Sequence, residues 1–90
     1  PFLARALGCV ERALAEGPKS RECIFRYRRG VLKLYLNERA DARADLALVA
    51  SGRCGGTSRH IEDRADSLLQ ALRVGLNPLR DLTILRKRRW

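Results

Sequence analysis

The apolar residues of this 90-residue chain recur three or four positions apart over almost its whole length, and they nowhere alternate for long. A spacing of three to four places apolar side chains on one face of an α-helix, whereas a half-buried β-strand needs strict alternation. The pattern therefore predicts an all-α fold without a sheet. We expect about five helices, packed as antiparallel helical hairpins.

Each expected helix carries one apolar stripe that a neighbouring helix can cover. The stripe residues are, in chain order, Leu3, Ala6, Leu7, Val10, Ala13 and Leu14; Ile24, Tyr27, Val31 and Leu34; Ala42, Leu46 and Val49; Ile61, Ala65, Leu68, Leu69, Leu72 and Leu76; and Leu79, Leu82 and Leu85.

Turn and capping residues separate the expected helices. Proline cannot continue a helix, and Ser, Thr and Asn side chains accept hydrogen bonds from the first free N–H groups of one. Three glycines in five positions make regular structure costly in the stretch that contains them. We therefore expect helix ends and caps at Gly17 and Pro18, at Ser20, at Asn37, at Thr57 or Ser58 and at Asn77 and Pro78, with residues 51–58 as the main loop.

The size and charge of the chain allow one small domain. We assign residues 1–85 to a single helical domain and residues 86–90 to a basic C-terminal tail. A chain of this length buries only about 60–65% of its unfolded surface, and a net charge of +9 works against compaction. A stable monomer is therefore not expected, and a partner that neutralises the charge is. The chain has no run of eighteen apolar residues, so we expect no transmembrane segment.

The cationic residues are concentrated in two places. Nineteen side chains are Lys or Arg against ten Asp or Glu, with one cluster around the expected second helix and another at the end of the chain. Each contact of such a residue with a phosphate releases condensed counterions, so these clusters are typical of a polyanion-binding protein. We predict RNA contacts by Arg21, Arg26, Arg28, Arg29 and Lys33 and by Arg86, Lys87, Arg88 and Arg89.

The alternative interpretation is a solvated helix face without a ligand. The RNA hypothesis requires the guanidinium groups to be free, and it would be contradicted if neighbouring carboxylates held them. Tyr27 and Tyr35 lie among the cations and could stack a base, but we favour core positions with hydroxyls at the rim.

No set of residues predicts catalysis. Cys9, Cys23 and Cys54 match neither a disulfide framework nor a zinc motif, so we expect reduced thiols and a reducing compartment. Cys54 and His60 alone are two ligands short of a structural metal site. We therefore expect no enzymatic activity, no cofactor and no metal.

Parts of the chain resemble helical repeats that pack small and large residues at fixed spacing. Residues 6–18 resemble the second helix of a tetratricopeptide-type repeat, and residues 68–78 are similar to the end of a pentatricopeptide repeat, the RNA-reading relative. The resemblance implies antiparallel helical hairpins and assigns no functional residue. The matching positions are Ala6, Val10, Ala13, Leu14 and Pro18, then Gly30, Ala42, Leu46 and Val49, and finally Leu68, Leu69, Gln70, Ala71, Leu72, Gly75 and Pro78.

Together these observations predict a non-enzymatic, Arg-rich structural subunit bound to RNA, specifically rRNA, and to neighbouring proteins in a large ribonucleoprotein. The chain begins with Pro1 and contains no Met, so we expect a processed product or a fragment. A basic protein that has lost a presequence suits the mitochondrial matrix, and a mitochondrial ribosome is the specific hypothesis. The alternatives are an accessory or assembly subunit of a membrane-bound complex and a helical-repeat adaptor between proteins.

Overall fold

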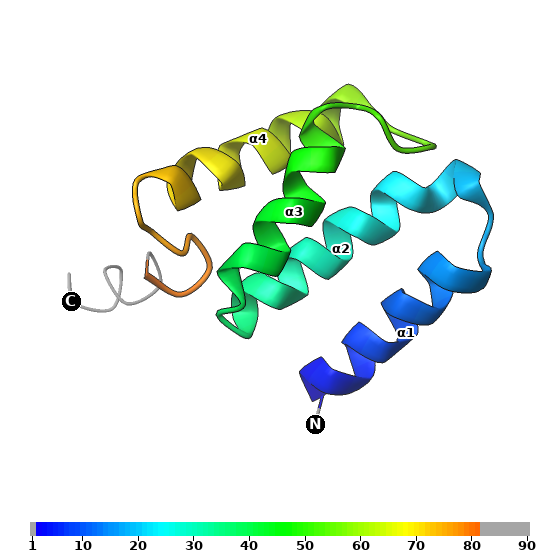
Figure 1. Ribbon diagram of the computed structural model, residues 1–90, viewed down its shortest axis with the longest axis horizontal. Helices are drawn as coiled ribbons and strands as arrows, with labels where there is room; N and C mark the ends of the chain where they lie inside the picture. Colours follow the sequence, from blue (N-terminus) through cyan, green and yellow to red (C-terminus); the bar gives the residue numbers. More distant parts are fainter. Residues whose placement is uncertain (1, 82–90) are drawn as a thin grey trace.

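The computed structural model describes residues 2–81, and this part of the chain is helical without a strand (Figure 1). The all-α prediction is confirmed, with four α-helices in the described residues instead of the expected five or so. Residues 78–80 form a turn and Asp81 is helical, while residues 82–85 of the expected fifth helix lie outside the described residues, as does the tail 86–90. The elements are α1 (Phe2–Glu16), the 3₁₀ helix η1 (Lys19–Arg21), α2 (Glu22–Tyr35), α3 (Arg39–Ala50) and α4 (Arg59–Arg73).

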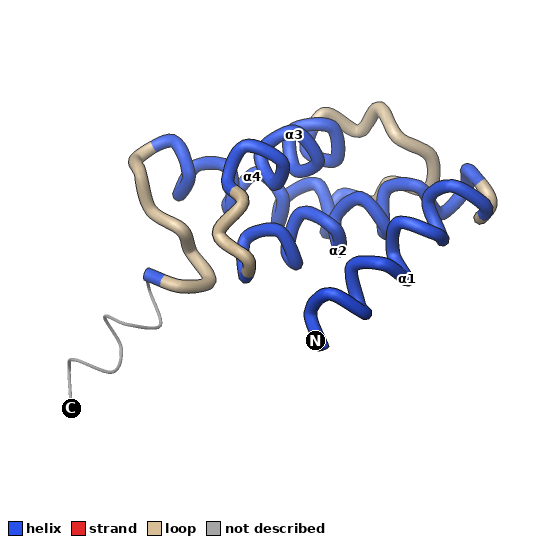
Figure 2. Tube along the Cα trace, turned by 60° about the horizontal axis from the view of Figure 1, so that its bottom comes forward, coloured by secondary structure: helices blue, strands red, loops and turns tan. Residues whose placement is uncertain are grey.

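The helices pack in the order in which they occur in the chain. α1 contacts α2, α2 contacts α3, and α3 contacts α4. Each helix turns back along the one before it, as Figure 1 shows, and Figure 2 shows α2 between α1 and the pair α3–α4. None of the described helices is long and apolar enough to cross a membrane.

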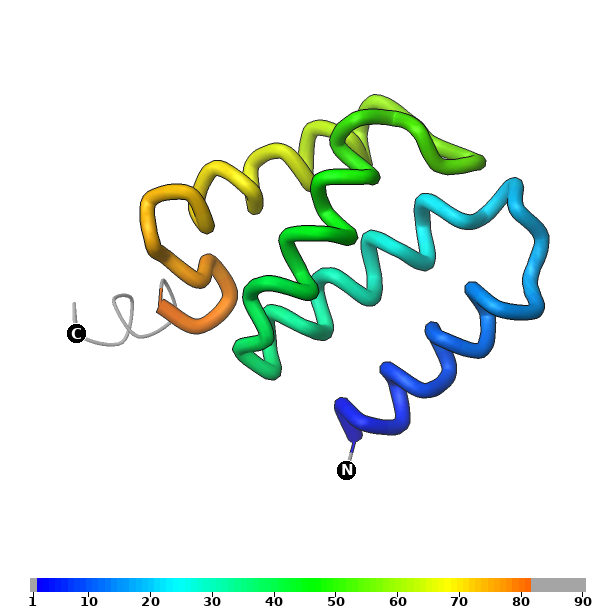
Figure 3. The backbone as a smooth tube through the Cα atoms, in the orientation of Figure 1, coloured from blue at the N-terminus to red at the C-terminus, as the bar shows by residue number. Residues whose placement is uncertain are grey.

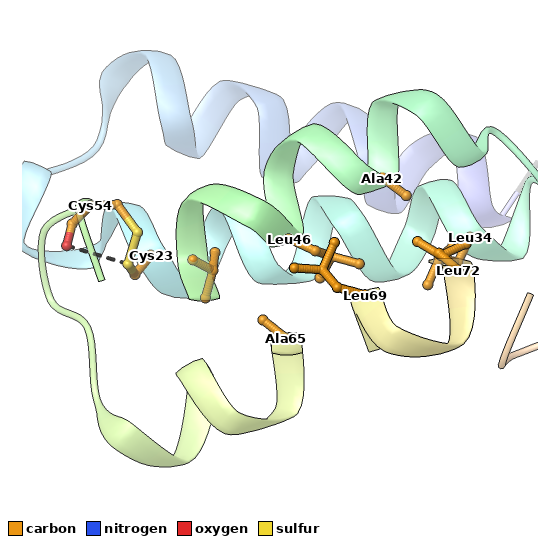
Figure 4. Packing of buried hydrophobic residues seen from close by; sticks show 9 residues of the cluster. Cys23, Leu34, Ala42, Leu46, Cys54, Ala65, Leu69 and Leu72 are labelled. Atoms are coloured by element: carbon orange, nitrogen blue, oxygen red, sulfur yellow. Dashed lines mark hydrogen bonds between the residues drawn. A yellow bond between two sulfur atoms is a disulfide. The ribbon is translucent and has the colours of Figure 1, made fainter. Parts of the chain in front are cut away.

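The core lies between α2, α3 and α4 (Figure 4). α1 contributes no buried residue, because only α2 covers its apolar stripe. Gly30 lets α2 and α3 approach closely, since a Cβ there would lie 3.0 Å from Cγ of Leu46. The buried apolar residues are Cys23, Leu34, Ala42, Leu46, Val49, Cys54, Ala65, Leu69 and Leu72, most of which belong to the predicted stripes.

Most of the predicted helix boundaries are confirmed. α1 ends before Gly17, whose N–H donates to the carbonyl of Ala13 at 2.7 Å. Asn37 adopts a φ of 60° in the turn between α2 and α3, a conformation that Asn tolerates better than most residues. Ser58 is the N-cap of α4, because its hydroxyl accepts a hydrogen bond from the N–H of Ile61 at 3.4 Å.

Ser20 does not cap α2, and that prediction was wrong. Residues 19–21 form η1 after Pro18, and the N–H of Arg21 donates to the Pro18 carbonyl at 3.1 Å. The chain thus enters α2 through a tight helical turn, and the N-cap position falls to Arg21, which makes no side-chain cap.

Asn77 ties the segment after α4 to the end of α2. Its side chain is fully buried and donates to the Leu34 carbonyl at 2.8 Å and to Oδ1 of Asn37 at 3.1 Å. It also accepts a hydrogen bond from the N–H of Leu79 at 3.2 Å, as an N-cap does.

Replacing Asn77 with alanine is expected to lower the free energy of unfolding by about 1–2 kcal/mol, because the cap and the buried hydrogen bonds are lost together. Urea denaturation followed by circular dichroism would measure the change. Ser67→Ala, at an exposed position of α4, is the control. Equal stability of the two variants would show that Asn77 does not hold the two segments together.

Candidate nucleic-acid interface

Two of the predicted RNA-binding arginines are held by carboxylates. Asp45 of α3 is only 4% exposed and accepts two hydrogen bonds from Arg29, from Nε at 2.7 Å and from Nη2 at 2.8 Å. Arg26 donates from Nε to Glu22 at 2.8 Å and from Nη1 to Asp45 at 3.4 Å. Planar two-point pairing of this kind is the strongest that arginine makes with a carboxylate.

These pairs also change the proton affinities of their members. Hydrogen bonding to Asp45 raises the pKa of the Arg29 guanidinium. The hydrogen bond from Arg26 lowers the pKa of Glu22 below its ordinary value. Both shifts favour the charged forms that make the contacts.

Lys33 is likewise engaged. Its Nζ lies 3.4 Å from a carboxylate oxygen of Glu38 and 3.5 Å from one of Asp41. Burial works against the charge of the ammonium group, but hydrogen bonding to Glu38 and then to Asp41 outweighs it and raises the pKa of Lys33.

The predicted cationic face of α2 is therefore compensated within the chain. The spacing correctly predicted that these side chains share one face, but that face looks toward the carboxylates of α3. The cations line a cleft of about 310 Å³ together with as many acidic residues, so the cleft offers no excess of positive charge. Its charged lining residues are Glu11, Arg26, Arg29, Lys33, Asp41 and Asp45. The requirement that Arg26, Arg29 and Lys33 be free is not met.

Arg21 and Arg28 are the predicted site residues that stay exposed without an ion pair to any described residue. Arg28 lies on another face of α2, beside an apolar groove of about 280 Å³ between α1 and α2. The groove is lined by Ala6, Val10, Tyr27, Arg28, Val31 and Leu32. The adaptor alternative would depend on this groove.

The remaining predicted site residues lie outside the described residues. They are Arg86, Lys87, Arg88 and Arg89.

The tyrosines differ from one another. Tyr27 packs against the core, as we favoured for both, whereas Tyr35 is 46% exposed at the end of α2. Arg28, which has no ion pair with a described residue, lines the same groove as Tyr27.

Cys23 and Cys54 form a disulfide, so the expectation of free, reduced thiols was wrong for both. The bond joins the first turn of α2 to the 51–58 loop across a sequence separation of 31, and both residues are buried (Figure 4). Cys9 is a free cysteine and is exposed. The sequence spacing carried no signal for this pairing, because only the packing of the loop against η1 brings the two residues together.

The disulfide belongs to a tight contact between the 51–58 loop and η1. The N–H of Cys23 donates to the carbonyl of Gly55 at 2.9 Å. A Cβ at Gly55 would overlap the carbonyl of Lys19, and one at Gly56 would overlap that of Ser20. Only glycine lets the two backbones lie this close. Figures 1 and 3 show the loop reaching across to the start of α2.

This contact brings together two segments that carry cations and lie far apart in the sequence. Lys19 and Arg21 come from η1, and Arg53 comes from the loop, next to Cys54. All three are exposed and form no ion pair with another described residue, although Lys19 attracts the Glu22 carboxylate from beyond ion-pair distance. We call Lys19, Arg21 and Arg53 the basic corner. Sequence reasoning missed Arg53, because it is isolated in the chain and only the folded loop brings it near η1.

No protein-family model matches the chain, and neither a curated protein nor a solved structure is significantly similar to it. The resemblance to helical repeats therefore stays a prediction. Within residues 2–81, no three His, Cys, Asp or Glu side chains gather as a metal site would require.

Proposed function

We propose that this chain is a non-enzymatic protein that binds RNA through phosphate contacts, as a subunit of a large ribonucleoprotein. The observation that carries the proposal is the basic corner, where two adjoining chain segments carry exposed cations that form no ion pair with a described carboxylate. Arg21 keeps its predicted role, and Lys19 and Arg53 take the place of Arg26, Arg29 and Lys33. Arg28 and the terminal cations Arg86, Lys87, Arg88 and Arg89 remain part of the proposal.

The physical basis is a difference in what each cation would lose on binding. Arg29 would have to give up a buried carboxylate to reach a phosphate, and that would leave Asp45 with only the longer contact from Arg26, at a cost of several kcal/mol. A cation of the basic corner exchanges only water and counterions for phosphate oxygens, and counterion release favours the exchange. RNA should therefore meet the corner rather than the cleft.

The finer parts of the proposal, an rRNA partner and a mitochondrial ribosome, are supported by the Arg-rich composition. Disulfides are rare where thioredoxin and glutathione keep thiols reduced. The Cys23–Cys54 bond therefore gives no support to a location in the mitochondrial matrix, which stays a hypothesis from the composition.

Fluorescence anisotropy with a labelled RNA hairpin, measured over a series of salt concentrations, tests the proposal. We expect the logarithm of the binding constant to fall linearly with the logarithm of the salt concentration. Replacing Arg21 and Arg53 together with glutamine should reduce the slope by about 2, since each lost phosphate contact removes about 1. Arg73→Gln removes the same kind of charge from the last turn of α4 and should leave the slope nearly unchanged.

Binding that ignores salt, or no binding at low salt, would rule the proposal out. Retention on vesicles of acidic lipid without any affinity for RNA would instead favour the accessory subunit of a membrane-bound complex. An equal effect of Arg73→Gln and the paired replacement would place the RNA contacts outside the basic corner.

A further inference from the structure

We infer that the Cys23–Cys54 disulfide controls the RNA affinity of the basic corner, with the oxidised protein binding tightly and the reduced protein weakly. This inference rests on the proposed function and adds redox regulation to the same site. It follows from where the disulfide lies, between the two segments that supply the cations.

The disulfide is the covalent link that fixes those segments to each other. Cys54 directly follows Arg53, and Cys23 lies two residues after Arg21, so the bond holds the backbones that carry both arginines. The Cα atoms of the two cysteines are 5.1 Å apart. Apart from the disulfide, the segments are joined by the hydrogen bond from the Cys23 N–H to the Gly55 carbonyl, by a hydrogen bond from the Gly55 backbone to the Glu22 carboxylate and by the glycine contacts.

Positive charge predominates at this contact. Lys19, Arg21 and Arg53 have the same sign, and the one carboxylate shown to interact with them, Glu22, is bonded to Arg26, accepts a backbone hydrogen bond from Gly55 and attracts Lys19. Exposed like charges repel one another within a Debye length, which is about 10 Å at 0.1 M salt. Once the disulfide is broken, repulsion favours a loop that moves away from η1, and the phosphate contacts of Arg53 and Arg21 are no longer made together.

The rest of the core does not depend on the bond. Figure 4 shows the cysteines at one end of the buried cluster and Leu34 and Leu72 at the other. Reduction should therefore loosen the corner and leave the helices formed, since local opening of a loop costs less than global unfolding.

The chemical step is a two-electron thiol–disulfide exchange with a dithiol reductant such as dithiothreitol. One thiolate of the reductant attacks a cysteine sulfur, forms a mixed disulfide and releases the other cysteine as a thiolate, which takes up a proton. The second thiolate of the reductant then closes its own disulfide and releases the first cysteine. Cys54 is the more accessible target, at 6% exposed against 0% for Cys23.

The test compares the oxidised and the dithiothreitol-reduced protein, each carrying Cys9→Ser so that the exposed thiol cannot cross-link two molecules. Both are titrated with the same labelled RNA hairpin over a salt series, and far-UV circular dichroism is recorded for each. We expect unchanged helical signal, weaker binding after reduction and a salt slope smaller by about 1, with full recovery on reoxidation. The double variant Cys23→Ser and Cys54→Ser should bind like the reduced protein under both conditions.

A second measurement tests the geometry rather than the bond. The effects of Arg21→Gln and Arg53→Gln on binding should be coupled in the oxidised protein and independent of each other in the reduced protein. Equal affinity in both redox states would overturn the inference, and the proposed function would stand if the arginine variants still bound less tightly. Absence of RNA binding by the oxidised protein would overturn the proposed function. Loss of the helical signal on reduction would also overturn the inference, because binding would then be lost through unfolding.

Discussion

Reduction of the Cys23–Cys54 disulfide is expected to lower the free energy of unfolding by about 3–4 kcal/mol. The bond closes a long loop, with a sequence separation of 31, and so restricts the unfolded chain more than a short cross-link would. This is a large share of the stability of so small a domain, which is typically about 5–10 kcal/mol. Urea denaturation of the Cys9→Ser protein, with and without reductant at about 15 °C, where stability is often greatest, would measure it.

The matched control is the double variant Cys23→Ala and Cys54→Ala, in which the reductant should change nothing. A difference below about 1 kcal/mol between the oxidised and reduced proteins would mean that the loop is already held against η1 by the glycine contacts. In that case the disulfide would contribute little to the fold, and the redox control of the basic corner would lose its physical basis.

Replacing Asp45 with asparagine should destabilise the protein by about 2–4 kcal/mol. Asparagine keeps the shape but removes the charge, and its amide would present a donor to the guanidinium groups of Arg26 and Arg29. Removing one member of a fully buried pair costs about 3–5 kcal/mol. The expected loss is smaller here because the arginine side chains are 29% and 26% exposed and can take up water.

Urea denaturation would measure the effect of Asp45→Asn, with Asp63→Asn as the control. Asp63 is exposed on α4 and forms no ion pair within the described residues, so its replacement should change stability by less than about 0.5 kcal/mol. Adding Arg29→Gln to Asp45→Asn should cost less than the sum of the two single changes, since the second removes the unpaired charge left by the first. Strict additivity would argue that Arg29 and Asp45 do not act as a pair in solution.

Much of the fold could be predicted from local pattern. The apolar spacing identified Leu46 and Leu69 as core residues, because a helix buries whichever face its neighbour covers. The helix end at Gly17 and the cap at Ser58 followed from backbone chemistry that acts within a few residues. Local pattern did not predict that cations of α2 pair with carboxylates of α3, because those partners lie on a different helix.

Sequence alone determined the helices, their apolar faces and the excess of positive charge, since each depends on residues close together in the chain. Tertiary structure alone decided which charges remain available. Asp45 lies two residues after Arg43 in the sequence, yet packing α3 on α2 buries it against Arg29. In the same way, the approach of a glycine-rich loop to η1 joins Cys23 to Cys54 and brings Arg53 near Arg21. Ion pairing and disulfide formation act at contact distance, and contacts between distant segments exist only once the helices have packed.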